Sequence, residues 1–324
     1  MMANAEASIV LVASRGADSV ARVMERLRQQ SVAPRLELVI AAWPEHVTEL
    51  AALDRGPLGA LTVIAADLST TARARAAAIS TVCGPVVIFA EDHAFPRGND
   101  WAERLIAAHA GPWAGVGPAV DCANPETSLS WAVLVAEYGP WIGVEATGEV
   151  DALPGHNSAY KRAALDACGD ALCDLLEAEW VLQRQLKAQG GKFLLLHDVI
   201  VDHVSFSRLP SALGITFWGG WMFAASRAAG WGRIKGAVWA LGAPAIFGVR
   251  MHRCLAQLRR RRDVAGTDLA DYAALAIILA ANAVGEAIGH AAGDCGLRHK
   301  LGRLECDRWR HVRSEESAAL FRPS

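Results

Sequence analysis

Three neighbouring residues able to bind a metal or transfer a proton follow an apolar run. Glu91-Asp92-His93 comes directly after residues 85–90 (PVVIFA). Acidic side chains cannot continue a buried strand, so we expect the strand to end here. A carboxylate beside an imidazole suits a divalent cation that neutralises a departing diphosphate. The same spacing also fits a helix N-cap by Asp92 with His93 in solvent, and spacing alone does not choose between the two.

Several buried strands and helices must position this triplet. Continuous apolar runs are typical of parallel strands that are covered on both faces, so the fold class is α/β. The runs are residues 8–13, 36–42, 60–65 and 85–90, with helical patterns at 17–30 and 72–81 between them. Ligands bind beyond the carboxyl ends of such strands. Ser14 and Arg15 follow the first run, so they should share an edge with Glu91.

A later helical pattern carries two candidate bases. We expect one helix over residues 172–189. At 100° per residue, Glu179 shares a face with Leu182 and Leu186, and Glu177 lies roughly opposite. A desolvated carboxylate gains the basicity that a general base needs, which favours Glu179. The alternative role for Glu179 is a buried ion pair with an arginine.

Composition restricts the class of protein. A chain of 324 residues fits one large domain, or one domain with an appendage. The net charge of -2 gives no general attraction to nucleic acid. The seven cysteines form no C-x-x-C pair, which indicates free thiols in a reducing cytosol and no structural zinc. We also see no signal peptide at the start.

The last third contains two short apolar segments. Residues 236–249 and 272–285 are free of charge, but a helix of about 14 residues rises only about 21 Å, against about 30 Å of hydrocarbon. We therefore expect a hairpin that dips into the cytoplasmic leaflet, with Arg259–Arg262 meeting anionic lipid. The alternative is a pair of buried core helices. Tryptophans that favour a membrane interface lie nearby: Trp218, Trp221, Trp231 and Trp239.

Five motifs in order resemble a known family. They are Ala74-Arg75, Glu91-Asp92-His93, residues 153–162 (LPGHNSAYKR), Glu177-Ala178-Glu179 and His203 after an apolar run. Together they resemble, over residues 8–208, a family 2 glycosyltransferase of the GT-A fold. That family usually has D-x-D where this chain has E-D-H, and the triplet is similar to that of a bacterial membrane-associated subfamily. The resemblance implies a catalytic domain over 1–208 and a helical region over 209–324.

The resemblance also implies roles for particular residues. Mg²⁺ or Mn²⁺ would bind Asp92, His93 and His203. The donor, a nucleotide diphosphate sugar, would meet Ser14, Arg15, Arg75, Glu91 and Asp92. Gly155, His156 and Asn157 would lie beside a lipid or lipid-linked acceptor, and Glu179 would be the base of an inverting transfer. The expected hairpin, rather than the resemblance, would place the site at the cytoplasmic face of the inner membrane and suggests the lipid acceptor.

Two departures from the family pattern keep other functions open. His93 replaces the second acid of D-x-D, and Ala41-Ala42-Trp43 stands where the family has an aspartate that contacts the nucleotide, so the nucleotide is undetermined. One alternative is a sugar-phosphate nucleotidyltransferase, for which Ser14-Arg15-Gly16 is a poor triphosphate loop. The other is a non-catalytic membrane protein that retains the fold.

Overall fold

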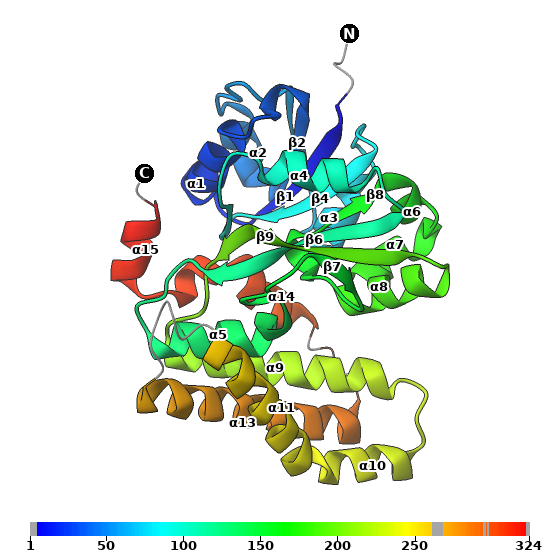
Figure 1. Cartoon of the computed structure of the whole chain (residues 1–324), viewed down its shortest axis with the longest axis vertical. Coiled ribbons are helices and arrows are strands. Elements are labelled where there is room, and N and C mark those ends of the chain that lie inside the picture. Colours follow the sequence, from blue (N-terminus) through cyan, green and yellow to red (C-terminus); the bar gives the residue numbers. More distant parts are fainter. Residues whose placement is uncertain (1–4, 261–267, 294–295, 297, 322–324) are drawn as a thin grey trace. The chain divides into compact units, whose positions relative to one another are not determined.

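The computed structural model describes residues 5–260, 268–293, 296 and 298–321 (Figure 1). The chain forms two compact units. Apart from residues outside those ranges, the first contains Met1–Ala123, Val144–His203 and Ala318–Ser324, and the second contains Asn124–Gly143 and Val204–Ser317. The division after His203 lies close to the expected boundary at residue 208. Helix α5 (Ser128–Tyr138), however, belongs to the second unit although it lies early in the chain.

The first unit is built on one mixed sheet. Its order is β3-β2-β1-β4-β8-β6-β9-β5, with β7 also paired to β9. The strands are β1 (Ala7–Ala13), β2 (Leu36–Ala42), β3 (Ala60–Ala65), β4 (Val86–Glu91), β5 (Ala94–Pro96), β6 (Trp113–Cys122), β7 (Gly148–Val150), β8 (Ala159–Lys161) and β9 (Lys192–His203). The pairings make β1, β2, β3, β4, β6 and β9 point the same way. Their carboxyl ends therefore share one edge.

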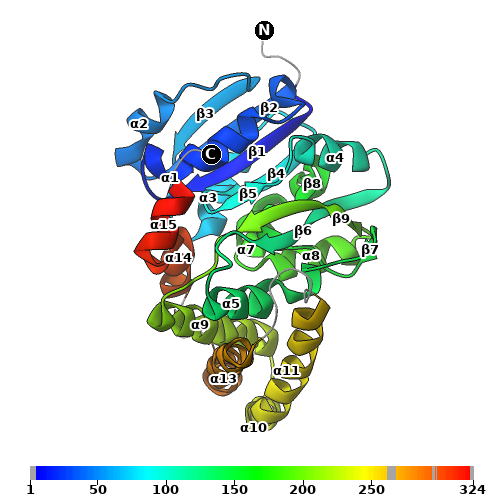
Figure 2. The same ribbon diagram turned by 60° about the vertical axis from the view of Figure 1, so that its left-hand side comes forward.

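Helices cover both faces of this sheet (Figures 1 and 2). They are α1 (Ala17–Arg28), α2 (Val47–Ala51), α3 (Thr71–Ile79), α4 (Trp101–Ala108), α6 (Arg162–Asp166), α7 (Leu172–Leu176) and α8 (Glu179–Ala188). Val10 and Val12 of β1 pack in one cluster with Ala74 of α3. The alternate residue Ile9 is also fully buried, so the opposite face is covered as well. The predicted α/β fold, with a mostly parallel sheet, is confirmed.

The helix predicted over residues 172–189 is two helices. It is interrupted at Glu177 and Ala178, where Ala178 has an extended backbone (φ -148°, ψ 111°). The Glu177 carboxylate accepts a hydrogen bond of 2.9 Å from the Thr70 hydroxyl, which also caps α3. This contact between distant segments replaces a helical turn, so a helical pattern alone could not reveal the break.

The second unit is helical. Besides α5 it contains α9 (Leu209–Ala228), α10 (Arg233–Leu241), α11 (Ala243–Arg260), α13 (Leu269–Ala292) and α14 (Arg298–Cys306), with α15 (Ser314–Phe321) at the division. The charge-free segment 236–249 is split between α10 and α11 at Gly242, and 272–285 is the middle of α13. Among the described residues, α13 alone is long and apolar enough to cross a membrane. In the basic run Arg259–Arg262, which was expected to meet anionic lipid, Arg261 and Arg262 lie outside the described residues.

Candidate active site

The carboxyl ends of β4 and β9 hold the central residues of the site. Glu91 is the last residue of β4, and His203 is the last residue of β9. After the turn at Asp92 and His93, strand β5 pairs antiparallel with β9 and places Ala94 opposite His203. The chain thereby returns His93 to the side of His203. The triplet and the late histidine, 110 positions apart in the sequence, meet at one sheet edge.

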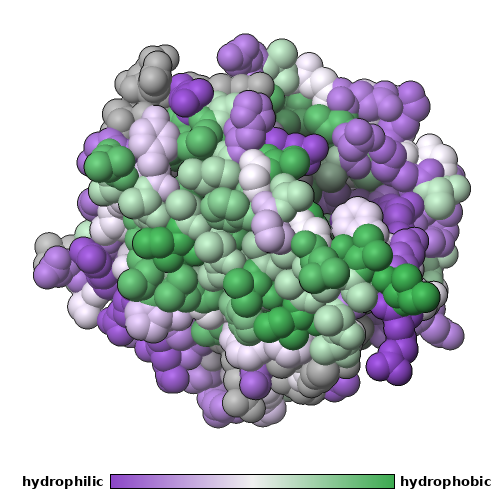
Figure 3. Space-filling model, turned by 90° about the horizontal axis from the view of Figure 1, so that it is seen from below, coloured by the Kyte–Doolittle hydropathy of each residue, from purple (hydrophilic) through white to green (hydrophobic). Residues whose placement is uncertain are grey.

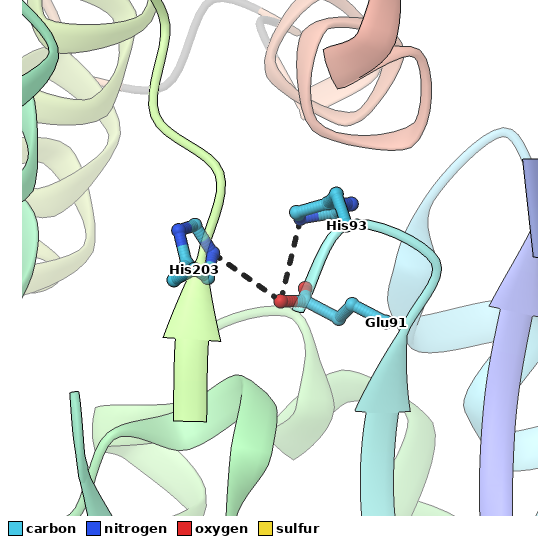
Figure 4. A group of neighbouring side chains, drawn as sticks. All are labelled: Glu91, His93 and His203. Atoms are coloured by element: carbon cyan, nitrogen blue, oxygen red, sulfur yellow. Dashed lines mark ion pairs between the residues drawn. The ribbon is translucent and has the colours of Figure 1, made fainter. Parts of the chain in front are cut away.

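Glu91 lies between two imidazoles (Figure 4). Its Oε2 atom is 3.4 Å from Nε2 of His93 and 3.5 Å from Nε2 of His203. The two rings meet edge to face with their centroids 5.2 Å apart. All three side chains are buried, and one potential ligand atom from each lies within 4.8 Å of the others. A cation about 2.1 Å from each ligand places them roughly 3.0–3.4 Å apart, so the group fits one divalent ion.

Asp92 occupies a different position from the one expected. Its Oδ1 atom lies 2.7 Å from Nδ1 of His93, and the side chain is buried. A histidine that binds a metal through one ring nitrogen commonly has a carboxylate on the other, which fixes the ring. The geometry therefore favours Glu91 as the carboxylate ligand and Asp92 as the residue that orients His93. His93 and His203 keep the positions that the sequence predicts for ligands.

Arg75 joins two carboxylates. It is completely buried; Nη1 donates to Oε1 of Glu179 at 2.7 Å, and Nη2 lies 3.6 Å from Oε1 of Glu91. Its guanidinium lies over the Phe89 ring, 5.1 Å from the centroid. Phe89 and Glu91 are two positions apart in a strand, so both point toward α3. The structure places Arg75 between Glu179 and Glu91, and its predicted contact with the diphosphate stays a prediction.

The cluster combines acidic, basic and imidazole side chains. Glu91, Asp92 and Glu179 supply three carboxylates, whereas Arg75 supplies one permanent positive charge. Buried charge is costly unless it is compensated. The donor set, two imidazoles and a carboxylate, is one that divalent transition metals accept readily.

Glu179 begins α8. It is the first helical residue, where the helix dipole favours a negative charge. Its side chain is 17% exposed and bonds Arg75, so the buried ion pair, which was the alternative role, is the contact that the structure contains. Glu177 bonds Thr70 instead, away from that pair. The two glutamates therefore have separate partners, which makes them a matched pair for mutation.

The loop that the resemblance assigns to the acceptor packs against Glu179. A short 3-10 helix, Gly155–Asn157, forms its centre. A Cβ atom on Gly155 would overlap the side chain of Glu179, so a glycine is required for this approach. Asn157 is buried, and its Nδ2 atom has no hydrogen-bond partner among the residues that the structure describes. The side chain of His156 lies outside the described residues.

Gln183 fixes this loop and was not identified from the sequence. Its side chain accepts a hydrogen bond from the Leu153 N–H at 2.9 Å and donates to the Leu153 carbonyl at 3.1 Å. It also donates to the Tyr160 hydroxyl at 3.0 Å. Burial raises the pKa of Tyr160, so this phenol stays neutral. A glutamine one turn after Glu179 on an otherwise apolar face was the signal available.

Ser14 and Arg15 lie at the expected edge. They follow β1, in which Val12 is in register with Glu91 of the neighbouring β4. Ser14 is half-buried and Arg15 is exposed. The prediction that both lie at the same sheet edge as the triplet is therefore confirmed, and their contact with a nucleotide stays a prediction.

Comparison with known proteins was made by sequence and by structure. No protein-family model matches the sequence, and no curated protein matches it. The mannosyltransferase PcManGT from Pyrobaculum calidifontis, solved with GDP-Man and Mn²⁺, has a TM-score of 0.53 at 14% identity, over 88% of this chain and 87% of that chain. Residues 1–349 of S. aureus TarS with UDP give 0.48 at 13% identity, over 87% and 90%. GalNAc-T7 with UDP, GalNAc and Mn²⁺ gives 0.48 at 18%, over 61% and 43%. The first of these likenesses shows the fold of this chain, which is α/β and of the GT-A type.

Proposed function

We propose that this chain is a metal-dependent glycosyltransferase. It would move a sugar from a nucleotide diphosphate sugar to a lipid or lipid-linked acceptor at the cytoplasmic face of the inner membrane. The observation that carries the proposal is the cluster of Glu91, His93 and His203 at the carboxyl edge of a GT-A sheet. The donor class is supported by PcManGT, which has the same fold and was solved with GDP-Man and Mn²⁺.

In this proposal the buried cluster holds Mg²⁺ or Mn²⁺. Glu91, His93 and His203 would be the protein ligands, and Asp92 would keep His93 in the ligating orientation. The bound ion would neutralise the charge that develops on the departing nucleoside diphosphate. Arg75 would hold the Glu91 carboxylate from behind, through its other oxygen. Ser14 and Arg15, at the same edge, would contact the nucleotide.

We assign acceptor activation to Glu179. Its carboxylate lies against Gly155, within the loop that would also present His156 and Asn157 to the acceptor. This carboxylate accepts a hydrogen bond from Arg75 at the start of α8, and in the proposed reaction it would accept the proton of an acceptor hydroxyl. In-line attack from this side would invert the anomeric centre. The E-D-H triplet would then mark a subfamily of the family 2 enzymes.

A panel of sugar nucleotides tests the proposed function. Thermal shift is measured with each nucleotide sugar, with and without Mn²⁺ or Mg²⁺, because a ligand of the folded state must raise the melting point. We expect one or more donors to raise it only with metal, and slow metal-dependent release of the nucleoside diphosphate. The Glu91→Gln variant should lose both effects. No metal-dependent shift with any donor would contradict the proposal, and release of pyrophosphate from a nucleoside triphosphate would favour a nucleotidyltransferase.

A further inference from the structure

Helix α10 presents large aliphatic side chains to solvent. Ile234, Val238 and Leu241 are 83%, 63% and 83% exposed, and their spacing places them on one face. The opposite face is buried at Gly236, where a Cβ atom would contact the backbone carbonyl of His290 in α13. This close packing fixes the rotation of α10. Gly236 is the buried residue of α10 and faces α13. The aliphatic face, on the opposite side of the helix, is therefore turned toward solvent.

Cationic and aromatic residues flank this aliphatic face. Arg233 and Lys235 are exposed and lie on either side of it. The Lys235 ammonium is 4.1 Å from the ring centroid of Trp231, which is half-buried. Residues 204–260 contain eight lysines and arginines and no aspartate or glutamate. The residues that flank the aliphatic face of α10 are thus positive, and the accessible acids of α13, Asp268 and Asp271, lie at the start of that helix.

Helix α13 continues the apolar surface. One row of its exposed side chains, spaced at three or four residues over about four turns, is uncharged: Leu269, Ala273, Ile277, Ala280 and Val284. Figure 3 shows hydrophobic side chains gathered over much of the underside of the molecule, where α10 and α13 lie. Soluble monomers rarely expose apolar patches beyond a few hundred Å². A surface of this kind requires an occupant.

A bilayer or a second copy of the chain could cover this surface. A symmetric dimer presents the same patch from both subunits, so the cationic rims would meet each other. Anionic phospholipid offers the opposite charge, and tryptophan favours the interface of a membrane. The charge pattern therefore favours the bilayer.

The inner side of α13 argues for lying on the bilayer rather than crossing it. Glu286 of α13 is buried in an ion pair with Arg250 of α11. Gly285 and Gly289 meet the backbone of α9 so closely that no larger residue fits without movement. This side of α13 packs against other helices of the protein, so the opposite face is the one open to lipid.

We propose that α10 and the outward face of α13 dock flat on anionic phospholipid, with Ile234, Val238 and Leu241 inserted among the headgroups. This surface would bring the proposed glycosyltransferase to a lipid-borne acceptor. That link to the acceptor rests on the proposed function. An in-plane helix also replaces the expected dipping hairpin, and it is the usual mode of a short amphipathic segment with cationic flanks. The apolar face of such helices is buried about 5–10 Å into the boundary between the headgroups and the acyl chains.

Flotation of the full chain with vesicles tests this surface. Vesicles of phosphatidylcholine, with or without phosphatidylglycerol, are used without sugar nucleotide or metal, so the outcome is independent of catalysis. We expect binding to the anionic vesicles, weaker binding to the neutral ones, and loss with rising salt. The double variant Ile234→Ser/Leu241→Ser should bind at least about tenfold more weakly, and Arg233→Gln/Lys235→Gln several-fold more weakly.

A control substitution separates the role of the α10 face from the general effect of replacing an exposed leucine with serine. Leu209→Ser removes an equally large side chain, 48% exposed, at the start of α9, about 30 Å along that helix from its connection to α10. It should bind like the unaltered chain. Unchanged melting points and unchanged metal-dependent donor binding would show that the α10 variants fold. The proposal is overturned if the unaltered chain ignores anionic vesicles, if the double variant binds them equally, or if the patch instead forms a dimer that the same substitutions dissociate.

Discussion

At the level of single residues, one oxygen of Glu91 faces two imidazoles and the other faces Arg75. The sequence identified each of these residues, because acids and histidines after buried strands have no place in a core. The sequence prediction puts the metal on Asp92, whereas the structure has Oε2 of Glu91 beside both imidazoles and Asp92 beside Nδ1 of His93. That choice depends on which side of the strand each points to, and on the turn that brings His93 back beside β9.

The two glutamates at the break between α7 and α8 give a direct test of the base. Glu179→Gln keeps the shape and a hydrogen bond to Arg75 but removes the proton-accepting charge. We expect transfer to fall about 10²–10⁴-fold, the usual contribution of a general base, while metal-dependent donor binding persists. Steady-state kinetics and thermal shift measure the two quantities. Glu177→Gln, whose partner is Thr70, should retain near-normal turnover; equal losses in both variants would argue for a purely structural role.

His109 gives a pH dependence of stability. It follows α4 and is buried, and burial, followed by the charge of Lys161, lowers its pKa to about 4 from 6.5. Between these values the unfolded chain binds the proton and the folded chain does not, so stability falls as pH falls from about 6.5 to 4. The contribution is up to about 3 kcal/mol. Urea unfolding of His109→Gln across this range should show a shallower pH dependence than the unaltered chain, and equal slopes would contradict the assignment.

At the level of elements, strands with continuous apolar runs were predicted close to their observed bounds. The three-residue strands β5, β7 and β8 were not, because three residues are too few to show a pattern. The break between α7 and α8 was also missed. It depends on Thr70 and Ala178, and the hydrogen bond that Thr70 makes to Glu177 joins segments 107 positions apart.

The packing of Gly155 against Glu179 gives a prediction at the scale of elements. Gly155→Ala would push its Cβ into the Glu179 side chain and separate the proposed base from Arg75. We expect turnover to drop at least about tenfold, as small displacements of catalytic groups commonly do. Gly148→Ala is the matched control, because nothing lies within 4 Å of the added atom. The test is to measure the turnover of both variants. If Gly155→Ala is as active as Gly148→Ala, the loop is not part of the active site.

At the level of the whole molecule, the sequence predicts a catalytic domain over 1–208 and a helical region over 209–324, and the structure divides the chain into two compact units with one division after His203. It could not place α5 in the second unit, because that membership arises from packing between segments far apart in the chain. The sequence shows two charge-free segments, but it does not show how these segments are divided into helices. Helix α13 is longer than its charge-free part, and Gly242 divides the other segment.

If the apolar surface brings the enzyme to its acceptor, membrane contact and chemistry are separable. The Ile234→Ser/Leu241→Ser variant should lose at least about tenfold in transfer to an acceptor lipid embedded in anionic vesicles. Its transfer to a short-chain, water-soluble analogue should remain within about twofold, because no residue of the first unit has changed. Parallel assays with radiolabelled donor measure both rates. An equal loss on both acceptors would mean that the substitutions act through folding or through the catalytic site.

The central claim is that Glu91, His93 and His203 hold one divalent cation. Titration with Mn²⁺, followed by the electron paramagnetic resonance of the free ion, measures this without any reaction. We expect one Mn²⁺ per chain, bound at least about tenfold more weakly in Glu91→Gln and His203→Ala, and weakened less in Asp92→Asn, which only orients a ligand. His197→Ala, an exposed histidine on the same strand, should bind like the unaltered chain. Equal Mn²⁺ affinity in His203→Ala and His197→Ala would contradict the account.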